Sequence, residues 1–238
     1  MRSSAPSDPG GPRQRRLLYG RRKGPKLSPH KEELRRTLLP RLALKLESGR
    51  DPRTYFAASV EDVWLEVGFG AGEHLLDQAR AHPDVGLIGA EPYEAGVAKL
   101  LTKIAGAPPL NLLIHEGDAR DIIAALPDAS LGRVFILFPD PWPKTRHHKR
   151  RFVQMETLDT LARAMRQAAE LRFASDDAGY FAWTLERLLA HPDFAWTARC
   201  AADWKIRPVG WPETRYEAKA LHGPPAYLGF VRRDRITL

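Results

Sequence analysis

Residues 138–151 have the sequence FPDPWPKTRHHKRR and combine a carboxylate, an indole and a block of positive charge. Asp140 and Trp142 stand between three prolines, which donate no backbone hydrogen bonds and hold the chain in an extended, kinked path. The eight residues from Lys144 to Arg151 include five Lys or Arg, two His and no acid. This combination predicts a site that acts on a polyanion, with the cations contacting phosphate groups. The alternatives are a solvated, charged helix entrance for the basic run and an indole that packs under the loop instead of stacking on a base.

The segment Glu66-Val-Gly68-Phe-Gly70-Ala-Gly72 is the second candidate for chemistry. Its glycines allow a tight turn and a close approach of the backbone to a cofactor. A dinucleotide-binding loop needs the pattern G-x-G-x-x-G, but here the third glycine comes one residue early and Glu73 takes its place. A G-x-G-x-G loop preceded by an acid favours S-adenosylmethionine, whose ammonium and sulfonium groups tolerate a nearby carboxylate. A purely structural glycine turn is the alternative.

Two further acids follow apolar runs. Glu91 comes nineteen residues after Gly72, where an acid can accept hydrogen bonds from both ribose hydroxyls of an adenosine cofactor. Asp118, in Glu116-Gly-Asp-Ala, can accept from an adenine amino group. Taken alone, an acid at such a position is more often a solvated loop residue than a ligand-binding group. Because ligands bind at the carboxyl ends of parallel strands, a glycine turn and two acids at successive strand ends predict one cofactor site.

The elements that position these residues follow from an alternation of short apolar runs and helical periodicity. A helix is expected to begin at Ser28, with Pro29 in its first turn and a kink at Pro40. The predicted strands are 63–67, 85–90, 111–115, 134–138, 171–174 and 227–231, and the predicted helices between them are 73–81, 93–104 and 152–169. This alternation predicts an α/β fold with a doubly wound, mostly parallel sheet and helices on both faces.

Composition predicts one domain, residues 27–238, behind a basic arm, residues 1–26. The arm carries eight Lys or Arg against Asp8 alone, and its Pro, Gly and Ser content predicts disorder. It is either a solubilising tail or a mobile source of phosphate contacts. The whole chain has 238 residues, 43% hydrophobic composition and a net charge of +8, which favours an acidic partner such as nucleic acid.

The single cysteine, Cys200, excludes a disulfide framework and a cysteine-based metal site, so a reducing compartment is expected. No apolar run approaches the ~20 residues that cross a bilayer. The start of the chain lacks the apolar region of a secretory signal, and its prolines and glycines oppose the helix of an organelle transit peptide. We therefore expect a cytoplasmic protein with no membrane partner and no metal. The sequence leaves open whether it is a monomer or a homodimer.

With the basic run attached, Pro139-Asp140-Pro141-Trp142 closely resembles the signature of the bacterial tRNA (guanine-N7-)-methyltransferases. The resemblance extends from about Val63 to the C-terminus and includes the glycine loop, both strand-end acids, Ser175-Asp-Asp with Tyr180, and Thr214-Arg-Tyr-Glu. It implies a class I methyltransferase with a Rossmann-like fold, which uses S-adenosylmethionine to form 7-methylguanosine at position 46 in the variable loop of tRNA.

The resemblance also implies a role for each matching residue. Asp140 is expected to be catalytic and to lie near the cofactor as well. The expected cofactor-binding residues are Glu66, Gly68, Gly70, Gly72, Glu91, Asp118 and Asp140. The expected contacts to substrate RNA are Lys144, Arg146, His147, His148, Lys149, Arg150, Arg151, Asp176, Thr214, Arg215, Tyr216 and Glu217. For Asp176, simple N-capping of a helix is the alternative.

Three other functions compete with this interpretation. An NAD-dependent oxidoreductase is opposed by the glycine spacing and the basic block, and a non-enzymatic RNA-binding protein has no need of acids at successive strand ends. A methyltransferase that acts on another RNA or on a small molecule is the strongest alternative. The chain also departs from the resemblance at Ala168-Ala-Glu170, where related chains usually carry a Gly-Gly turn.

Overall fold

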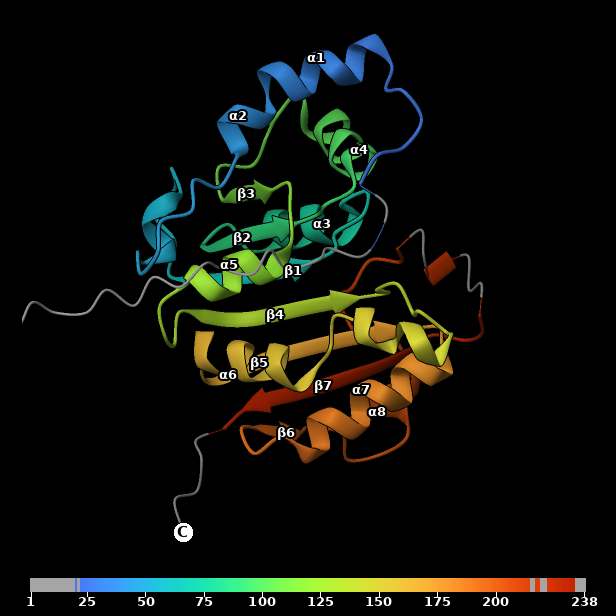
Figure 1. Cartoon of the computed structure of the whole chain (residues 1–238). Helices are drawn as coiled ribbons and strands as arrows, with labels where there is room; N and C mark the ends of the chain where they lie inside the picture. Colours follow the sequence, from blue (N-terminus) through green and yellow to red (C-terminus); the bar gives the residue numbers. More distant parts are fainter. Residues whose placement is uncertain (1–19, 21, 215–216, 219–221, 234–238) are drawn as a thin grey trace, which may run out of the picture.

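A mixed seven-stranded sheet lies at the centre of the computed structural model, which describes residues 20, 22–214, 217–218 and 222–233 (Figure 1). The strands of this described part are β1 (Asp62–Val67), β2 (Val85–Ala90), β3 (Leu112–His115), β4 (Leu131–Leu137), β5 (Met165–Ser175), β6 (Phe194–Trp196) and β7 (Ala226–Arg232). Their order is β3-β2-β1-β4-β5-β7-β6. The first five strands pair in parallel, whereas β7 runs antiparallel to both β5 and β6. The predicted doubly wound α/β fold is confirmed.

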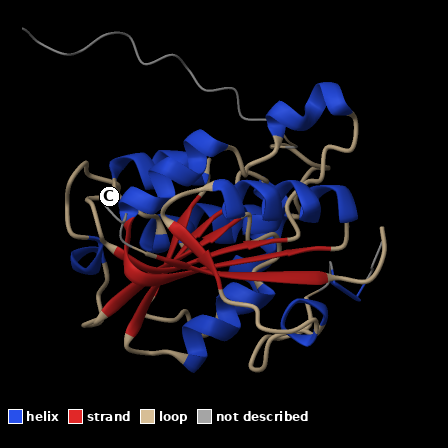
Figure 2. Cartoon of the chain, turned by 90° about the horizontal axis from the view of Figure 1, so that it is seen from below, coloured by secondary structure: helices blue, strands red, loops and turns tan. Residues whose placement is uncertain are grey.

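Helices cover both faces of the sheet, as Figure 2 shows. The α-helices are α1 (Pro29–Thr37), α2 (Leu39–Leu42), α3 (Glu73–Ala81), α4 (Glu94–Ile104), α5 (Ala119–Ala125), α6 (Met155–Ala164), α7 (Ala178–Ala190) and α8 (Ala202–Lys205). Two 3-10 helices, η1 (Pro52–Tyr55) and η2 (Thr145–Arg150), complete the described elements. As predicted, Ser28 precedes the first helix, and the helical path is interrupted near Pro40: α1 ends before Leu38, and the short α2 begins at Leu39 with Pro40 in its first turn.

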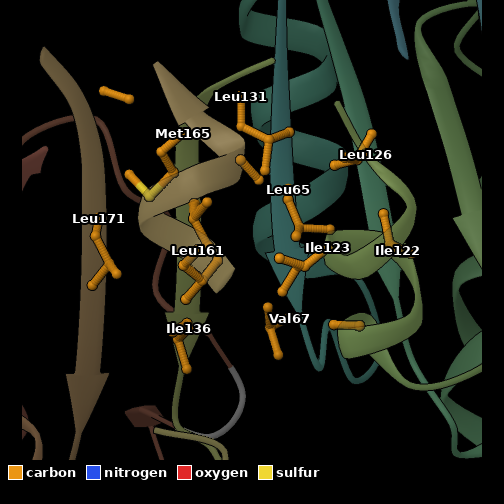
Figure 3. Close-up of a cluster of buried hydrophobic side chains, with 14 of the residues drawn as sticks. Leu65, Val67, Ile122, Ile123, Leu126, Leu131, Ile136, Leu161, Met165 and Leu171 are labelled. Atoms are coloured by element: carbon orange, nitrogen blue, oxygen red, sulfur yellow. The ribbon is translucent and has the colours of Figure 1, made fainter. Parts of the chain in front are cut away.

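The two faces of the sheet carry separate apolar clusters. One cluster packs β1, β4 and β5 against α5, α6 and α7, and Figure 3 shows part of it around Leu65, Ile123 and Leu161. The other packs β2 and β3 against α3, α4 and the α1–α2 segment. Every residue of β2 is buried, which explains its continuous apolar sequence, because a strand covered on both faces needs no polar side. This double packing fixes the strand ends on which the candidate site depends.

The predicted helix over 152–169 is wrong at both ends. Helix α6 covers only Met155–Ala164, and the chain then enters β5 at Met165 without a loop. Met165 continues the apolar spacing of the helix, but it is buried by pairing with Leu131 in the sheet. The ladder between β4 and β5 is irregular after this pair, and Ala168 takes the left-handed conformation, with φ of 61°. The apolar spacing of helix α6 therefore continues into the first residue of β5, and for this reason the predicted helix was too long.

All six predicted strands are present, and β2 has the predicted bounds. Three short elements, α5, β6 and α8, were not predicted, since three to seven residues are too few to show a period. The thirteen-residue helix α7 was also absent from the three predicted helices. The predicted basic arm lies outside the described residues apart from Gly20 and 22–26. Its disorder therefore stays a prediction.

Candidate active site

A cavity of about 250 Å³ opens at the carboxyl ends of the first four strands. Its wall includes Gly68 and Gly70 after β1, Glu91 after β2, Asp118 after β3 and Asp140 after β4. The chain order of the strands reverses between β1 and β4, and in open α/β sheets the crevice at such a point is where ligands bind. The structure thus brings together residues from four separate sequence segments, as the strand-end argument predicted.

The glycine loop between β1 and α3 uses its glycines for two different purposes. Gly68, Gly70 and Gly72 all have positive φ angles, of 71°, 58° and 73°. No atom lies within 4 Å of where a Cβ of Gly68 would stand, so that residue leaves its side of the cavity open. A Cβ on Gly72 would instead lie 2.7 Å from the Leu100 side chain of α4. Gly72 therefore serves packing and is absent from the cavity wall, whereas Gly68 and Gly70 belong to it.

Glu91 is buried and supports the glycine loop. Its carboxylate accepts hydrogen bonds from the backbone N–H groups of Gly70, at 2.7 Å, and of Tyr93, at 2.8 Å. Burial raises the pKa of Glu91 to about 7, because desolvation of the charge outweighs the effect of both backbone donors. Each oxygen keeps a second lone pair for a ligand hydroxyl. Glu91 is thus a buried acceptor that faces the cavity and titrates near neutral pH.

Glu66, unlike the predicted cofactor residues Glu91, Asp118 and Asp140, does not line the main cavity. It is buried, and its carboxylate contacts Nδ1 of His74, also buried, at 2.7 Å. The pair lines a smaller neighbouring hollow together with Phe138 and Thr214. Nε2 of His74 has no hydrogen-bond partner in the described part of the chain. The structure therefore places Glu66 behind the glycine loop and outside the wall of the main cavity.

Asp118 stands in the cavity wall but is already engaged. One oxygen caps helix α5 by accepting from the backbone N–H of Arg120 at 3.0 Å. The other forms an ion pair with the Arg120 guanidinium at 2.6 Å. Arg120 itself belongs to the wall. A ligand at this strand end has to share the Asp118 carboxylate with Arg120.

The loop after β4 carries Asp140 in a strained backbone. Phe138 and Trp142 have φ angles of 49° and 45°, a conformation that is costly for residues with a side chain. The loop begins where the N–H of Phe138 donates to the carbonyl of Ala174 at 2.8 Å. Asp140 is exposed at the mouth of the cavity, yet neighbouring protein atoms exclude enough water to raise the pKa of its carboxyl. The geometry presents one carboxylate on a rigid turn.

The basic run continues directly into the 3-10 helix η2. Lys144, just before this helix, and Arg146 and Lys149 within it are exposed, whereas His147 and His148 are half-buried. Partial desolvation and four neighbouring cations lower the pKa of His147. The charges of this segment therefore lie at the surface, beside the mouth of the cavity.

Arg150 and Trp142 also belong to the cavity wall. The Arg150 guanidinium lies 5.0 Å from the centre of the Trp142 ring, which is within cation–π range. Trp142 is half-buried, so the choice between base stacking and packing under the loop stays open.

Arg151, the last residue of the predicted RNA-binding run, is placed differently from its exposed neighbours. Its side chain is buried, with 3% of the residue surface exposed. Nε donates to the carbonyl of Pro141 at 2.8 Å, and a terminal nitrogen lies 3.5 Å from the carbonyl of Gly179. The uniform charge of the segment concealed this difference, because a sequence of cations does not say which one points inward.

The chain resembles curated proteins over most of its length. Residues 61–225 match a protein family described as "Putative methyltransferase". The tRNA (guanine-N(7)-)-methyltransferase of Rhodospirillum rubrum is 50% identical over 234 residues, which is 95% of this chain and 92% of the relative. The protein of that name from Brucella abortus is 47% identical over 220 residues, or 91% of this chain and 94% of the relative. The chain belongs to the tRNA (guanine-N(7)-)-methyltransferase family.

Solved structures agree with this family in fold. The 16S rRNA (adenine(1408)-N(1))-methyltransferase from Catenulisporales acidiphilia superposes with a TM-score of 0.53 at 17% identity, covering 81% of this chain and 98% of that one. The aminoglycoside resistance methyltransferase NpmB1 gives 0.51 at 17% identity, covering 74% and 89%. At such low identity the likeness shows the Rossmann-like class I methyltransferase fold alone.

Of the predicted substrate residues in this tRNA (guanine-N(7)-)-methyltransferase family member, Asp176 directly follows β5 and the segment 214–217 precedes β7 in the chain. Asp176 is half-buried, and its carboxylate accepts from the backbone N–H of His222 at 3.2 Å. The alternative of helix capping by Asp176 is wrong, because Asp177 caps α7 by accepting from the N–H of Tyr180. Asp176 is thus left to hold the segment before β7.

The predicted Thr214–Glu217 segment is described only in part, since Arg215 and Tyr216 lie outside the described residues. Thr214 is buried, and its hydroxyl accepts from the N–H of Glu217 at 3.2 Å. The Glu217 carboxylate accepts from the Tyr227 hydroxyl at 2.5 Å and lies 3.5 Å from the Arg207 guanidinium.

Sequence reasoning missed some wall residues of this methyltransferase fold. Gly20, Tyr93 and Phe152 all line the main cavity. Tyr93 comes two residues after Glu91, so its position beyond a strand end was a signal that could have been used. Gly20 belongs to a segment far from the sheet in sequence, and nothing in its neighbours indicates that it approaches Asp140.

Proposed function

We propose that the protein transfers a methyl group from S-adenosylmethionine to N7 of guanosine 46 in the variable loop of tRNA. The observation that carries this proposal is the convergence of Glu91, Asp118 and Asp140 on one cavity beside an exposed basic helix. The names of the relatives support a tRNA substrate and the guanine N7 atom. Position 46 comes from the resemblance of the 138–151 segment.

The cavity wall suits S-adenosylmethionine. Gly68 leaves room for a ligand, and Glu91 offers buried acceptor positions of the kind that ribose hydroxyls require. Asp118 is the expected acceptor for the adenine amino group, next to the Arg120 side chain. Glu66 could act only from behind the loop, through the hollow that it shares with His74. When bound, the cofactor supplies a methyl group on a sulfonium, which is activated for transfer.

The reaction requires little acid–base catalysis by the protein. Guanine N7 carries a lone pair and no proton, so it attacks the methyl carbon directly while the carbon–sulfur bond breaks. The C–N7 bond forms, the ring takes up the positive charge, and no proton has to leave N7. The task of the protein is therefore to align three atoms, and alignment of this kind supplies on the order of 7–11 kcal/mol.

Asp140 has the best position for that task. It lies at the mouth of the cavity on a turn that three prolines and two strained residues make rigid. A carboxylate there can accept from N1–H and the exocyclic amine of guanine, whereas adenine presents the opposite hydrogen-bond pattern. Asp140 would thereby select guanine and fix the base at the mouth of the cavity.

The exposed cations of the basic helix supply the affinity for RNA. Lys144, Arg146 and Lys149 face solvent beside the cavity mouth, where phosphate contacts release counterions. Within the proposal, the domain 27–238 carries the reaction, and the basic arm 1–26 adds salt-dependent contacts. A tRNA substrate favours a cytoplasmic location. Among the described residues, no helix has the length and apolar character that a membrane span requires.

The decisive experiment is a methylation assay with an unmodified tRNA transcript and S-adenosylmethionine labelled in the methyl group. Digestion to nucleosides should show label in 7-methylguanosine, and a transcript with adenosine in place of guanosine 46 should receive none. Label in 7-methylguanosine from both transcripts would refute position 46 alone. Label in a different nucleoside, or no label in tRNA, would refute the proposed reaction.

A further inference from the structure

Arg151 occupies a place that the proposed reaction does not explain. It is the last cation of the basic run, yet it is buried while Lys144, Arg146 and Lys149 are exposed. No carboxylate lies within ion-pair distance of its guanidinium among the residues that the structure describes. A buried cation without an ion-pair partner is costly, so the contacts that replace one must be specific.

The contacts of Arg151 join two separate segments. Nε donates to the carbonyl of Pro141, one residue after Asp140, at 2.8 Å. A terminal nitrogen on the same plane lies 3.5 Å from the carbonyl of Gly179, in the first turn of α7. The flat guanidinium thus links the Asp140 loop to a helix more than thirty residues further along the chain. A lysine ammonium cannot reproduce this forked geometry.

Two aromatic rings complete the environment of Arg151. The guanidinium carbon lies 4.9 Å from the ring centre of Tyr180 and 5.0 Å from that of Trp183. Both rings are fixed by Val153, whose N–H donates to the Tyr180 hydroxyl and whose carbonyl accepts from Trp183 Nε1. The rings belong to α7, which lies beside the segment after β4 in Figure 1. Arg151 therefore rests on two rings that are each held by a hydrogen bond of their own.

The loop needs such an anchor because its backbone is strained. Left-handed φ angles at Phe138 and Trp142 cost about 1–3 kcal/mol each and persist only where the surroundings enforce them. The start of the loop is held by the hydrogen bond from Phe138 to Ala174. At its middle, the carbonyl of Pro141 is held by Arg151. The three prolines of the loop have no backbone N–H groups. The donor that holds the Pro141 carbonyl therefore comes from outside the loop.

We propose that Arg151 is a positioning residue, which fixes the loop 139–143 against helix α7 and thereby sets the place of Asp140. This inference rests on the proposed function, since it assumes that Asp140 orients guanine. Loss of Arg151 should therefore lower the rate of methyl transfer. Loss of its exposed neighbours should instead weaken the binding of RNA.

The test compares Arg151→Met with Arg146→Met, which removes an exposed cation five residues away by the same substitution. A misplacement of about 1 Å costs on the order of a hundredfold in rate, so kcat of Arg151→Met should fall about ten- to hundredfold. Its Kd for tRNA should stay within about threefold, with an unchanged salt slope. Arg146→Met should instead weaken tRNA binding and reduce the salt slope by about one.

Cooperative unfolding shows that Arg151→Met is folded. If that variant does not fold, a second variant provides the test. Arg151→Lys retains the positive charge but carries its three donors on a single nitrogen, so it cannot span the carbonyls of Pro141 and Gly179 as the planar fork does. Its kcat should also fall while the tRNA Kd and salt slope stay as in the wild type. A wild-type kcat in a folded Arg151→Met or in Arg151→Lys overturns the proposal. So does a loss confined to tRNA affinity and salt slope, which would return Arg151 to the RNA interface. If the wild-type protein forms no 7-methylguanosine, the proposed function itself has failed, which is a separate result.

Discussion

The replacement Glu91→Gln tests whether a buried charge in the wall of the main cavity destabilises the fold. Glu91 is 7% exposed, and desolvation raises the pKa of its carboxyl to about 7 from an ordinary value of 4.5. Between these two values the folded state binds more protons than the unfolded state. The free energy of unfolding of the wild type therefore falls as pH rises through this range. Glutamine carries no titrating proton, so the variant lacks this contribution.

The size of the effect follows from the difference between the folded and unfolded pKa values. Integrating the linkage relation between pH 5 and pH 8 gives a loss of about 2.5 kcal/mol in the wild type. Glutamine also changes the hydrogen bonds, because only its carbonyl oxygen can accept from the N–H of Gly70 or Tyr93. The donor left without an acceptor costs about 1–3 kcal/mol at every pH. The first effect depends on pH and the second does not, so the two can be separated.

Urea unfolding at pH 5, 6, 7 and 8 and constant ionic strength gives the required free energies. The stability of Glu91→Gln relative to the wild type should rise by about 2.5 kcal/mol over this range. Glu61→Gln, which removes an exposed carboxyl just before β1, is the matched control for loss of a charge. A difference between Glu91→Gln and the wild type that is constant with pH would refute the argument from desolvation.

Three further predictions concern the loop, the basic helix and the sheet. Asp140→Ala should lower kcat for tRNA methylation at least about a hundredfold while the Kd for tRNA stays within about threefold. Initial rates measure kcat and filter binding measures Kd, and a wild-type rate would exclude the proposed role of Asp140. The double charge reversal Arg146→Glu and Lys149→Glu should weaken tRNA binding more than tenfold at ~100 mM salt and flatten the salt dependence; an unchanged slope would remove both residues from the interface. Ala168→Gly should raise the free energy of unfolding by about 0.5 kcal/mol, because relief of a left-handed alanine, about 1–2 kcal/mol, exceeds the added freedom of the unfolded chain. Thermal unfolding should then show a midpoint about 1–2 °C higher, whereas a lower midpoint would mean that Ala168 is not strained.

The part of the site that the sequence predicted is the part fixed by sheet topology. A parallel strand has one carboxyl end, and all such ends meet along one edge, so Glu91, Asp118 and Asp140 had to converge once the strands were recognised. The apolar runs of the strands were visible because both faces of the sheet are covered. Neither step required knowledge of a side-chain conformation.

The part that could not be predicted depends on contacts between side chains. Glu66 and His74 are eight residues apart, and nothing in either sequence segment says that their side chains meet in a buried pair. The boundary between α6 and β5 was hidden because Met165 fits the apolar face of a helix as well as the inner face of a strand. Only pairing with Leu131, which is distant in sequence, decides between the two.

The neighbours Arg150 and Arg151 show the same limit within one motif. Both follow the same proline-rich loop and carry the same charge, yet Arg150 lies over Trp142 in the cavity wall and Arg151 lies between Tyr180 and Trp183. The change of direction occurs where the 3-10 helix ends, at Arg150, because the next residue leaves the helical path. A run of cations that looks uniform in sequence thus divides into a surface that can bind RNA and an anchor that can hold the Asp140 loop. Under the two proposals, this division gives a reason for the basic run to follow the loop directly: the last cation would fix the carboxylate, and the preceding cations would bind the RNA on which it acts.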